Sequence, residues 1–198
     1  MFSYLYKHWA FMCLPIAIFS TLILACSFSV LSLSIFLIWI QFPIYLVHQF
    51  EEHAYPGGFK RFINENIFKI KGVDMPLTDQ SVFWINATAI WFFFPLFAAL
   101  AQLVNPIFGV ILPCFGLFNA TTHILVAILL RKYNPGLLVS LFLNYPFGIY
   151  TLYVLTQMGN FGLEANLIGW GTALLGHILM MLDGALKARA YKQRRGRS

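Results

Sequence analysis

The feature that most constrains this chain is the length of its apolar runs. From Trp9 to Val47 there is no charged residue. As one helix this run would be about 58 Å long at about 1.5 Å per residue, nearly twice the roughly 30 Å thickness of a bilayer's hydrocarbon core. The run must therefore turn, and the best candidate is the Cys-Ser-Phe-Ser stretch at residues 26–29. We expect two membrane-spanning helices here, at about 9–26 and 29–48.

Four further apolar runs follow, separated by turn-forming residues such as Asn105-Pro106 and Asn134-Pro135-Gly136. They predict spans at about 81–103, 107–130, 136–157 and 165–187. The composition agrees, because 60% of the residues are hydrophobic and 10% are charged, against about 25% charged in soluble domains. An ordinary soluble enzyme, a nucleic-acid module and a disordered tail are therefore excluded. We predict one all-α polytopic membrane domain, residues 1–198, with six transmembrane helices, or five if 9–26 is not a span.

The cations give independent support for six spans, because a six-span arrangement places all thirteen on one side of the membrane. They are Lys7, Lys60, Arg61, Lys69, Lys71, Arg131, Lys132, Lys187, Arg189, Lys192, Arg194, Arg195 and Arg197. The positive-inside rule makes that side cytoplasmic. We therefore expect an integral protein of a bacterial inner membrane with both termini in the cytoplasm. The basic tail at 188–198 is interpreted as a topology anchor that contacts anionic lipids, and no nucleic-acid partner is expected.

Two segments admit alternative interpretations. Lys7, the apolar run after it and Ile23-Leu24-Ala25-Cys26 resemble a lipoprotein signal with its lipidated cysteine. An uncleaved first helix is favoured, because the chain continues directly into another span. In residues 58–71, apolar and charged side chains separate at helical spacing, which predicts an amphipathic helix in the cytoplasmic interface. The alternative there is a loop whose residues alternate by chance.

The most informative motif is His48-Gln49-Phe50-Glu51-Glu52-His53. At about 100° per residue, Glu51 lies about 60° to one side of His48 and Glu52 about 40° to the other. His53 lies about 140° away and joins them only if the helix ends or distorts there. An imidazole and two carboxylates on one helix face can bind a divalent transition metal or act as an acid–base set. The alternative is a polar rim at the lipid headgroups.

Further polar residues lie inside the predicted spans, at about 8–15 Å from the same side of the membrane, with Asn119 one turn deeper than His123. His123 and His177 are the two histidines among them, and the asparagines are Asn86, Asn119 and Asn144. Intramembrane polar groups are costly and usually functional. We therefore predict one site in which the metal ligands are His48, Glu52, His123 and His177, with His53 as an additional candidate. The predicted ion is zinc or iron, the predicted catalytic residues are His48, Glu51 and Glu52, and the three asparagines are supporting polar groups.

Several of these residues form a pattern that is similar to that of a known family. His48-x-x-Glu51-Glu52, His123 and Tyr133-Asn134-Pro135-Gly136 are together similar to the HXXEE family of small bacterial membrane proteins, over about residues 35–185. The resemblance implies a membrane helix bundle in which His48, Glu51, Glu52, His123 and His177 are site residues. In that family the motif, the further histidines and the asparagine–proline signature have suggested an enzyme, but they supply no substrate.

Three functions fit these observations. The first is an intramembrane enzyme, metal-dependent or acid–base, that acts on a lipid-soluble substrate near the cytoplasmic leaflet. The second is a proton- or metal-coupled transporter, in which the histidines and carboxylates would be relay groups. Against it, the two halves of the chain show no repeat, and the polar residues occupy only one half of the membrane. The third is a non-catalytic membrane subunit whose basic tail contacts an unknown partner protein.

Overall fold

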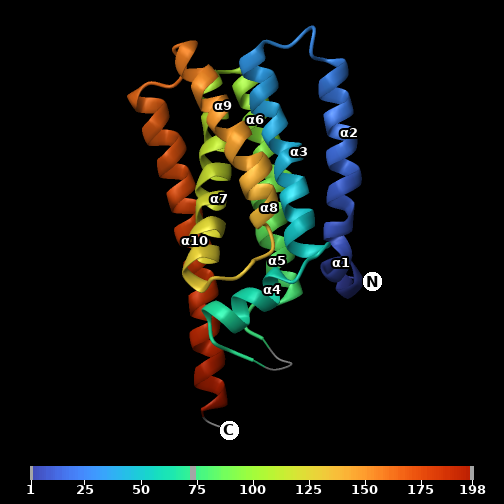
Figure 1. The fold of residues 1–198 in the computed structure, drawn as a ribbon, viewed down its shortest axis with the longest axis vertical. Coiled ribbons are helices and arrows are strands. Elements are labelled where there is room, and N and C mark those ends of the chain that lie inside the picture. Colours follow the sequence, from blue (N-terminus) through green and yellow to red (C-terminus); the bar gives the residue numbers. More distant parts are fainter. Residues whose placement is uncertain (1, 72–74, 197–198) are drawn as a thin grey trace.

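The computed structural model describes residues 2–71 and 75–196. Within them every regular element is a helix, and six helices are long and apolar enough to cross a membrane. They stand side by side as one bundle, with both ends of the chain at the same end of it, here called the termini end (Figure 1). The prediction of an all-α membrane bundle with six long apolar helices is confirmed.

Most spans consist of two or three consecutive helical segments. The first span comprises α1 (Phe2–His8), η1 (Trp9–Met12) and α2 (Cys13–Cys26), and the second is α3 (Leu33–His53). The third comprises α5 (Asp79–Asn86), η3 (Ala87–Phe92) and α6 (Phe93–Leu103), and the fourth η4 (Pro106–Val110) and α7 (Ile111–Leu130). The fifth comprises α8 (Leu137–Val139), η5 (Ser140–Asn144) and α9 (Tyr145–Gln157), and the sixth is α10 (Leu163–Arg195).

Helix α3 differs from the predicted span 29–48 at both ends. It begins at Leu33 because the hydroxyl of Ser32 accepts a hydrogen bond from the backbone N–H of Ile35, which caps the first turn. It continues to His53, five residues beyond the predicted end. The whole His48–His53 motif is therefore helical and lies on the last two turns of α3.

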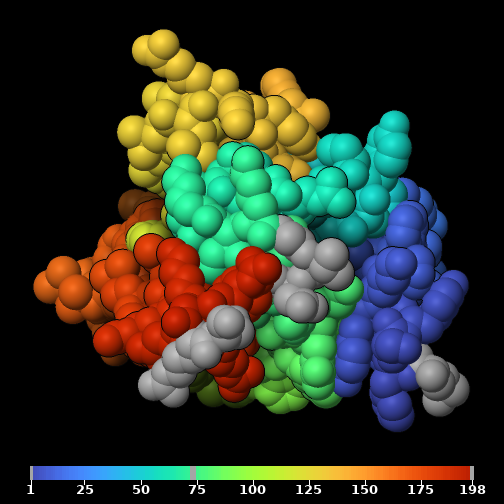
Figure 2. All heavy atoms as spheres, turned by 90° about the horizontal axis from the view of Figure 1, so that it is seen from below, coloured from blue at the N-terminus to red at the C-terminus, as the bar shows by residue number. Residues whose placement is uncertain are grey.

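The termini end differs from the prediction in two further ways. Helix α10 continues to Arg195, so the predicted basic tail is helical over 188–195; Arg197 and Ser198 lie outside the described residues. The predicted interfacial helix at 58–71 is shorter, with α4 (Phe59–Phe62) continuing into a π-helical turn, η2 (Ile63–Ile67). Seen from below, this segment lies across the end of the bundle, with α10 on one side and the N-terminal segment on the other (Figure 2).

Helices α3 and α7 form the centre of the bundle. Helix α3 packs against α2, α6, α7 and α9, while α7 also packs against α10. Between them lies a buried aromatic cluster in which the rings of Tyr45, Phe94 and Phe115 are 5.0–5.8 Å apart. Helices α2 and α10 lie at the periphery, and large apolar side chains such as Leu22 and Leu167 are exposed on their outer faces. Polar side chains of α3 and α7 can therefore be buried together inside the bundle.

Two spans are widened by π-helical turns that precede prolines. The turn at Ala87–Phe92 comes before Pro95, and the turn at Ser140–Asn144 comes before Pro146. A proline has no N–H to donate, so the regular hydrogen-bond ladder is interrupted one turn before it. The second of these turns brings the buried side chain of Asn144 to α3, beside His48.

Candidate metal centre

The carboxylate of Glu52 is the centre of the buried polar cluster. Glu52 lies on the last turn of α3 and is 5% exposed. Its Oε1 is 3.5 Å from Nε2 of His48, one turn earlier on the same helix, and 3.1 Å from Nε2 of His123 on α7. Its Oε2 is 3.3 Å from Nε2 of His53. Three imidazoles therefore face one carboxylate in the interior of the bundle.

The geometry of His48, Glu52 and His123 fits a single metal ion. One ligand atom from each lies within 4.8 Å of the other two. Around a tetrahedral zinc ion with bonds of about 2.0–2.1 Å, neighbouring ligand atoms are about 3.3–3.4 Å apart. The two distances to Oε1, 3.1 and 3.5 Å, bracket that value. Nε2 of His48 is also buried without a hydrogen-bond partner, so an ion between these groups would satisfy an atom that is otherwise unpaired.

Asn134 determines how His123 presents its ring. The side-chain amide of Asn134 donates to the backbone carbonyl of His123 over 2.9 Å, which leaves its Oδ1 to accept from Nδ1–H of the same histidine. In the neutral ring, Nε2 then carries a lone pair directed toward Glu52. Two lone pairs facing each other across 3.1 Å require a proton or a cation between them. Such a hydrogen bond to the second ring nitrogen is typical of histidines that bind metals.

A series of side-chain hydrogen bonds through two amide groups positions His53 beside Oε2, the second carboxylate oxygen of Glu52. The indole N–H of Trp91 donates to Oε1 of Gln49, and Nε2 of Gln49 donates to Oδ1 of Asn86, each over 2.9 Å. Because an indole can only donate, these contacts fix the orientation of both amides. Nδ2 of Asn86 consequently faces Nε2 of His53 at 3.3 Å. The network therefore holds Nε2 of His53 between the side-chain amide of Asn86 and the carboxylate of Glu52.

His48 has an asparagine neighbour of its own. Nδ1 of His48 lies 3.3 Å from the side-chain nitrogen of Asn144. Rotation of this amide by half a turn would let its oxygen accept from Nδ1–H and leave Nε2 free as a ligand, and the two amide orientations have the same shape. On its other side the ring of His48 packs 5.1 Å from that of Tyr45. The imidazole is thus held between an amide and an aromatic ring.

Glu51 has different neighbours from Glu52. One of its oxygens accepts hydrogen bonds from the hydroxyl of Tyr133 over 2.7 Å and from the backbone N–H of Leu138 over 3.0 Å. The other accepts from the backbone N–H of Val139 over 2.7 Å. A carboxylate in this position caps the helix N-terminus that begins at α8 and offsets its positive dipole. Burial, and then the hydrogen bond to Glu51, raise the pKa of the Tyr133 hydroxyl.

The Asn134-Pro135-Gly136 turn packs directly onto the cluster. Gly136 has a φ of +98°, a conformation that favours glycine. A Cβ atom at this position would lie 2.7 Å from Cε1 of His123, 2.8 Å from Cε1 of His48 and 2.9 Å from Cγ of Glu52. The turn therefore leaves no room for a side chain above the three candidate ligands.

Two residues predicted for the site lie elsewhere. His177 on α10 donates from Nδ1 to the backbone carbonyl of Ala173, one turn earlier. Its ring packs between those of Phe115 and Phe118, with centroids 4.6 and 4.5 Å away. It is not in the group of converging ligand atoms, and Oδ1 of Asn119 on α7 is buried without a hydrogen-bond partner. Asn86 and Asn144, by contrast, contact His53 and His48.

Four residues of the cluster were not assigned to the site from the sequence: Gln49, Tyr133, Asn134 and Gly136. A signal was present for all of them. Gln49 lies inside the motif itself, and the other three belong to the Tyr-Asn-Pro-Gly signature after α7. That signature indicated a turn, but only the fold shows that the turn lies against the motif.

Comparison with protein families gives a match over more than half of the chain. The model of a family described as proteins of unknown function with an HXXEE motif matches residues 39–151. This range contains all residues of the cluster on α3 and α7 and the turn that covers them, but it ends before α10 and His177. No curated protein and no solved structure matches the chain.

Proposed function

The chain belongs to the HXXEE family, and from this premise we propose that it is an intramembrane enzyme. In this proposal His48, Glu52 and His123 hold one divalent transition metal ion, and the substrate is hydrophobic. The observation that carries the proposal is the approach of two imidazole Nε2 atoms, from two different helices, to one buried carboxylate oxygen at 3.1 and 3.5 Å. The unpaired Nε2 of His48 supports it.

The donor set narrows the choice of ion. Two imidazoles and one carboxylate form the ligand set of many catalytic zinc sites and of non-haem iron(II) sites. Both types keep at least one coordination position open for water or substrate. When bound, such an ion supplies Lewis acidity and lowers the pKa of a coordinated water. Zinc and iron(II) are therefore the ions to test first.

The remaining residues of the cluster have positioning roles in this proposal. Asn134 and Asn144 orient the two imidazoles. Glu51 ties to α3 the residues on either side of the turn at 134–136, through its hydrogen bonds to Tyr133 and to the start of α8. The aromatic cluster around Tyr45 closes the bundle beside His48 and limits the access of water. This division leaves Glu52 as the carboxylate that contacts the ion.

We further propose that the termini end faces the cytoplasm of a bacterium. The loops at the opposite end, residues 27–32, 104–105 and 158–162, lack charged side chains, whereas the cations lie toward the termini end. This is the pattern of the positive-inside rule. The cluster lies near the termini end of α3 and α7, so a membrane-dissolved substrate would meet it in the cytoplasmic half of the bilayer.

A metal-free version of the site is the second candidate. The 3.1 Å between Nε2 of His123 and Oε1 of Glu52 also fits a charge-assisted hydrogen bond between an imidazolium and a carboxylate. The same groups would then move a proton on a hydrophobic substrate. The two versions differ in whether the folded protein binds a metal.

Metal analysis of the purified protein separates them. We expect about one zinc or iron ion per chain in the wild type and background levels in His48→Ala and Glu52→Gln, because each removes one of three ligands. Glu164→Gln is the matched control: it removes an exposed carboxylate at the start of α10 and should keep the ion. Folding of every variant is checked by size-exclusion chromatography. Metal-free wild type after incubation with zinc and iron(II), or equal metal in all variants, would contradict the metal version.

A further inference from the structure

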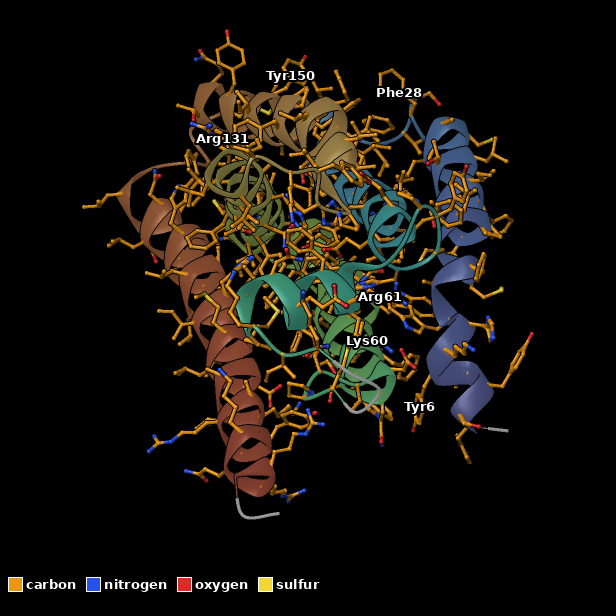
Figure 3. All side chains as sticks on the ribbon, turned by 60° about the horizontal axis from the view of Figure 1, so that its bottom comes forward. Tyr6, Phe28, Lys60, Arg61, Arg131 and Tyr150 are labelled. Carbon is orange, nitrogen blue, oxygen red and sulfur yellow. The ribbon has the colours of Figure 1, made fainter. Side chains whose placement is uncertain are left out.

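A cavity of about 360 Å³ lies beside the cluster at the termini end. Its wall is formed by the N-terminal segment, the end of α3, α4 and the start of α5. Lys60 and Arg61 on α4 and Tyr6 on α1 are among the lining residues, and Figure 3 shows them at this end of the bundle. The volume lies near the lower end of the range for small-molecule sites, about 300–1,000 Å³. The cavity therefore suits a headgroup or another small group rather than a whole lipid.

The inner wall of the cavity is aromatic. The ring of His53 lies there, with the ring of Trp9 5.3 Å away and that of Phe59 5.6 Å away. Trp9 itself is buried. An indole and a phenyl ring at this depth provide an apolar surface close to the boundary between lipid and water.

The outer wall of the cavity carries an excess of positive charge. Three cations line it, Lys7, Lys60 and Arg61, together with a single carboxylate, Asp79. Lys60 forms an ion pair with Asp79. Within the described residues no acidic side chain lies within ion-pair distance of Lys7 or Arg61. Two cations in the cavity wall are thus left to bind an anion.

The cavity and the cluster share one side chain. His53 lines the cavity, and its Nε2 lies 3.3 Å from Oε2 of Glu52. A molecule in the cavity would therefore be separated from the candidate metal ligands by a single imidazole. This places the cavity on a route from the membrane boundary to Glu52.

We propose that this cavity binds the phosphate-type headgroup of an anionic amphiphile, which is the substrate of the neighbouring cluster. Lys7 and Arg61 hold the anionic group, since lysine and arginine are the side chains that pair with phosphate oxygens. Trp9 and Phe59 contact the first part of its apolar portion. This inference rests on the proposed function, because it assigns the substrate class of the same site.

The test uses purified protein in nanodiscs of neutral phosphatidylcholine, titrated calorimetrically with dihexanoyl phosphatidic acid. Dihexanoylglycerol and inorganic phosphate are the two comparison ligands, one without the charge and one without the apolar part. We expect saturable binding of the phosphatidic acid and weaker binding of both others. Lys7→Gln/Arg61→Gln should weaken it by about tenfold or more, because two charge-assisted contacts are lost. Raising the salt concentration should weaken binding to the wild type as well, a readout that needs no variant.

The control variant is Lys192→Gln/Arg194→Gln, which makes the same charge change on α10 outside this cavity and should bind like the wild type. Equal weakening in both double variants would mean general attraction to a basic surface and would overturn the proposal. Inorganic phosphate binding as tightly as phosphatidic acid would overturn the assignment to an amphiphile, and tight binding of dihexanoylglycerol would overturn the role of the cations.

Metal content is measured on the same samples, so that the two proposals fail separately. If the wild type carries metal but does not bind phosphatidic acid, the substrate class is wrong and the metal site stands. If it binds phosphatidic acid through Lys7 and Arg61 without any metal, the cavity stands and the metal version of the proposed function fails. Where the wild type carries metal, the double variant should keep it, because neither Lys7 nor Arg61 contacts Glu52, His48 or His123.

Discussion

Two regions of this bundle bury histidines inside membrane-spanning helices, and their surroundings differ. At the end of α3, His48 and His123 come from separate helices and face one carboxylate. At the seam between α7 and α10, His177 is similarly buried, but it donates to a carbonyl of its own helix and packs between two phenylalanine rings. Burial and depth alone therefore do not distinguish a ligand from a packing residue.

The difference lies in where the partners of each histidine come from. The contact of His177 with the carbonyl of Ala173, four residues earlier on the same helix, is local and needs no tertiary arrangement. Donors from distant parts of the sequence converge only when the fold is arranged to bring them together. His123 and Glu52 are 71 positions apart, and the turn after α7 supplies Asn134 and Gly136 to the same place. Among the described residues, only the first region therefore brings together potential metal ligands from distant parts of the chain.

The largest difference in metal binding should come from replacing, in turn, the two buried histidines His123 on α7 and His177 on α10. We expect His123→Ala to weaken metal binding by roughly 100-fold, which is about one fifth of the free energy that holds a structural zinc ion. His177→Ala should leave the metal content unchanged, because its ring is not among the converging ligands. Zinc titration with a competing chelator measures both. Loss of metal from His177→Ala would contradict the distinction between His123 as a ligand and His177 as a packing residue.

An intermediate effect on metal binding is expected for a residue that contacts a candidate ligand and not the ion itself. Asn134→Ala should weaken metal binding by about 10–100-fold, the usual cost of removing the partner that orients a metal-binding histidine. Asn119→Ala is its matched control on α7, since no hydrogen bond joins its side chain to His123. The same chelator competition measures both variants. Equal effects of the two substitutions would indicate that any change in α7 disturbs the site.

The smallest effect on the metal is expected at Glu51, at the edge of the cluster. Glu51→Gln should keep metal binding within about twofold, but it replaces the charged acceptor of three hydrogen bonds. Hydrogen bonds to charged groups contribute about 1.5–3 kcal/mol, so we expect a loss of about 2 kcal/mol in stability, seen as a lower midpoint of thermal unfolding in detergent. Glu52→Gln should show the reverse pattern, with the metal lost. Loss of metal in both would mean that the two carboxylates act together.

Much of the fold could be predicted from the sequence, because the membrane imposes two simple rules. Uncharged runs of about 20 residues gave the six spans, and the sides of the cations agreed with them. The helix ends were less predictable. Extension of α3 to His53 depends on the packing of residues 49–53 against other helices, and the continuation of α10 to Arg195 has no apolar signal.

The residue types of the site could be predicted from the sequence, but the separate roles of Glu51 and Glu52 could not. Helical geometry places Glu51 and Glu52 near one face, and nothing in the sequence distinguishes them. They differ because α8 begins beside Glu51 and supplies backbone N–H groups to it, while α7 places His123 beside Glu52. The role of Asn134 likewise depends on a turn that closes over α3. These are contacts between segments far apart in the chain, which one sequence does not encode locally.

The most direct measurement of the central claim is X-ray absorption at the edge of the metal recovered from the wild type. If His48, Glu52 and His123 share the ion, the spectrum will contain a first shell of nitrogen and oxygen at about 2.0–2.2 Å and the outer-shell scattering of two imidazole rings. In His123→Ala reloaded with metal, the imidazole scattering should fall to that of one ring. A first shell of sulfur, or a spectrum without imidazole scattering, would contradict the account.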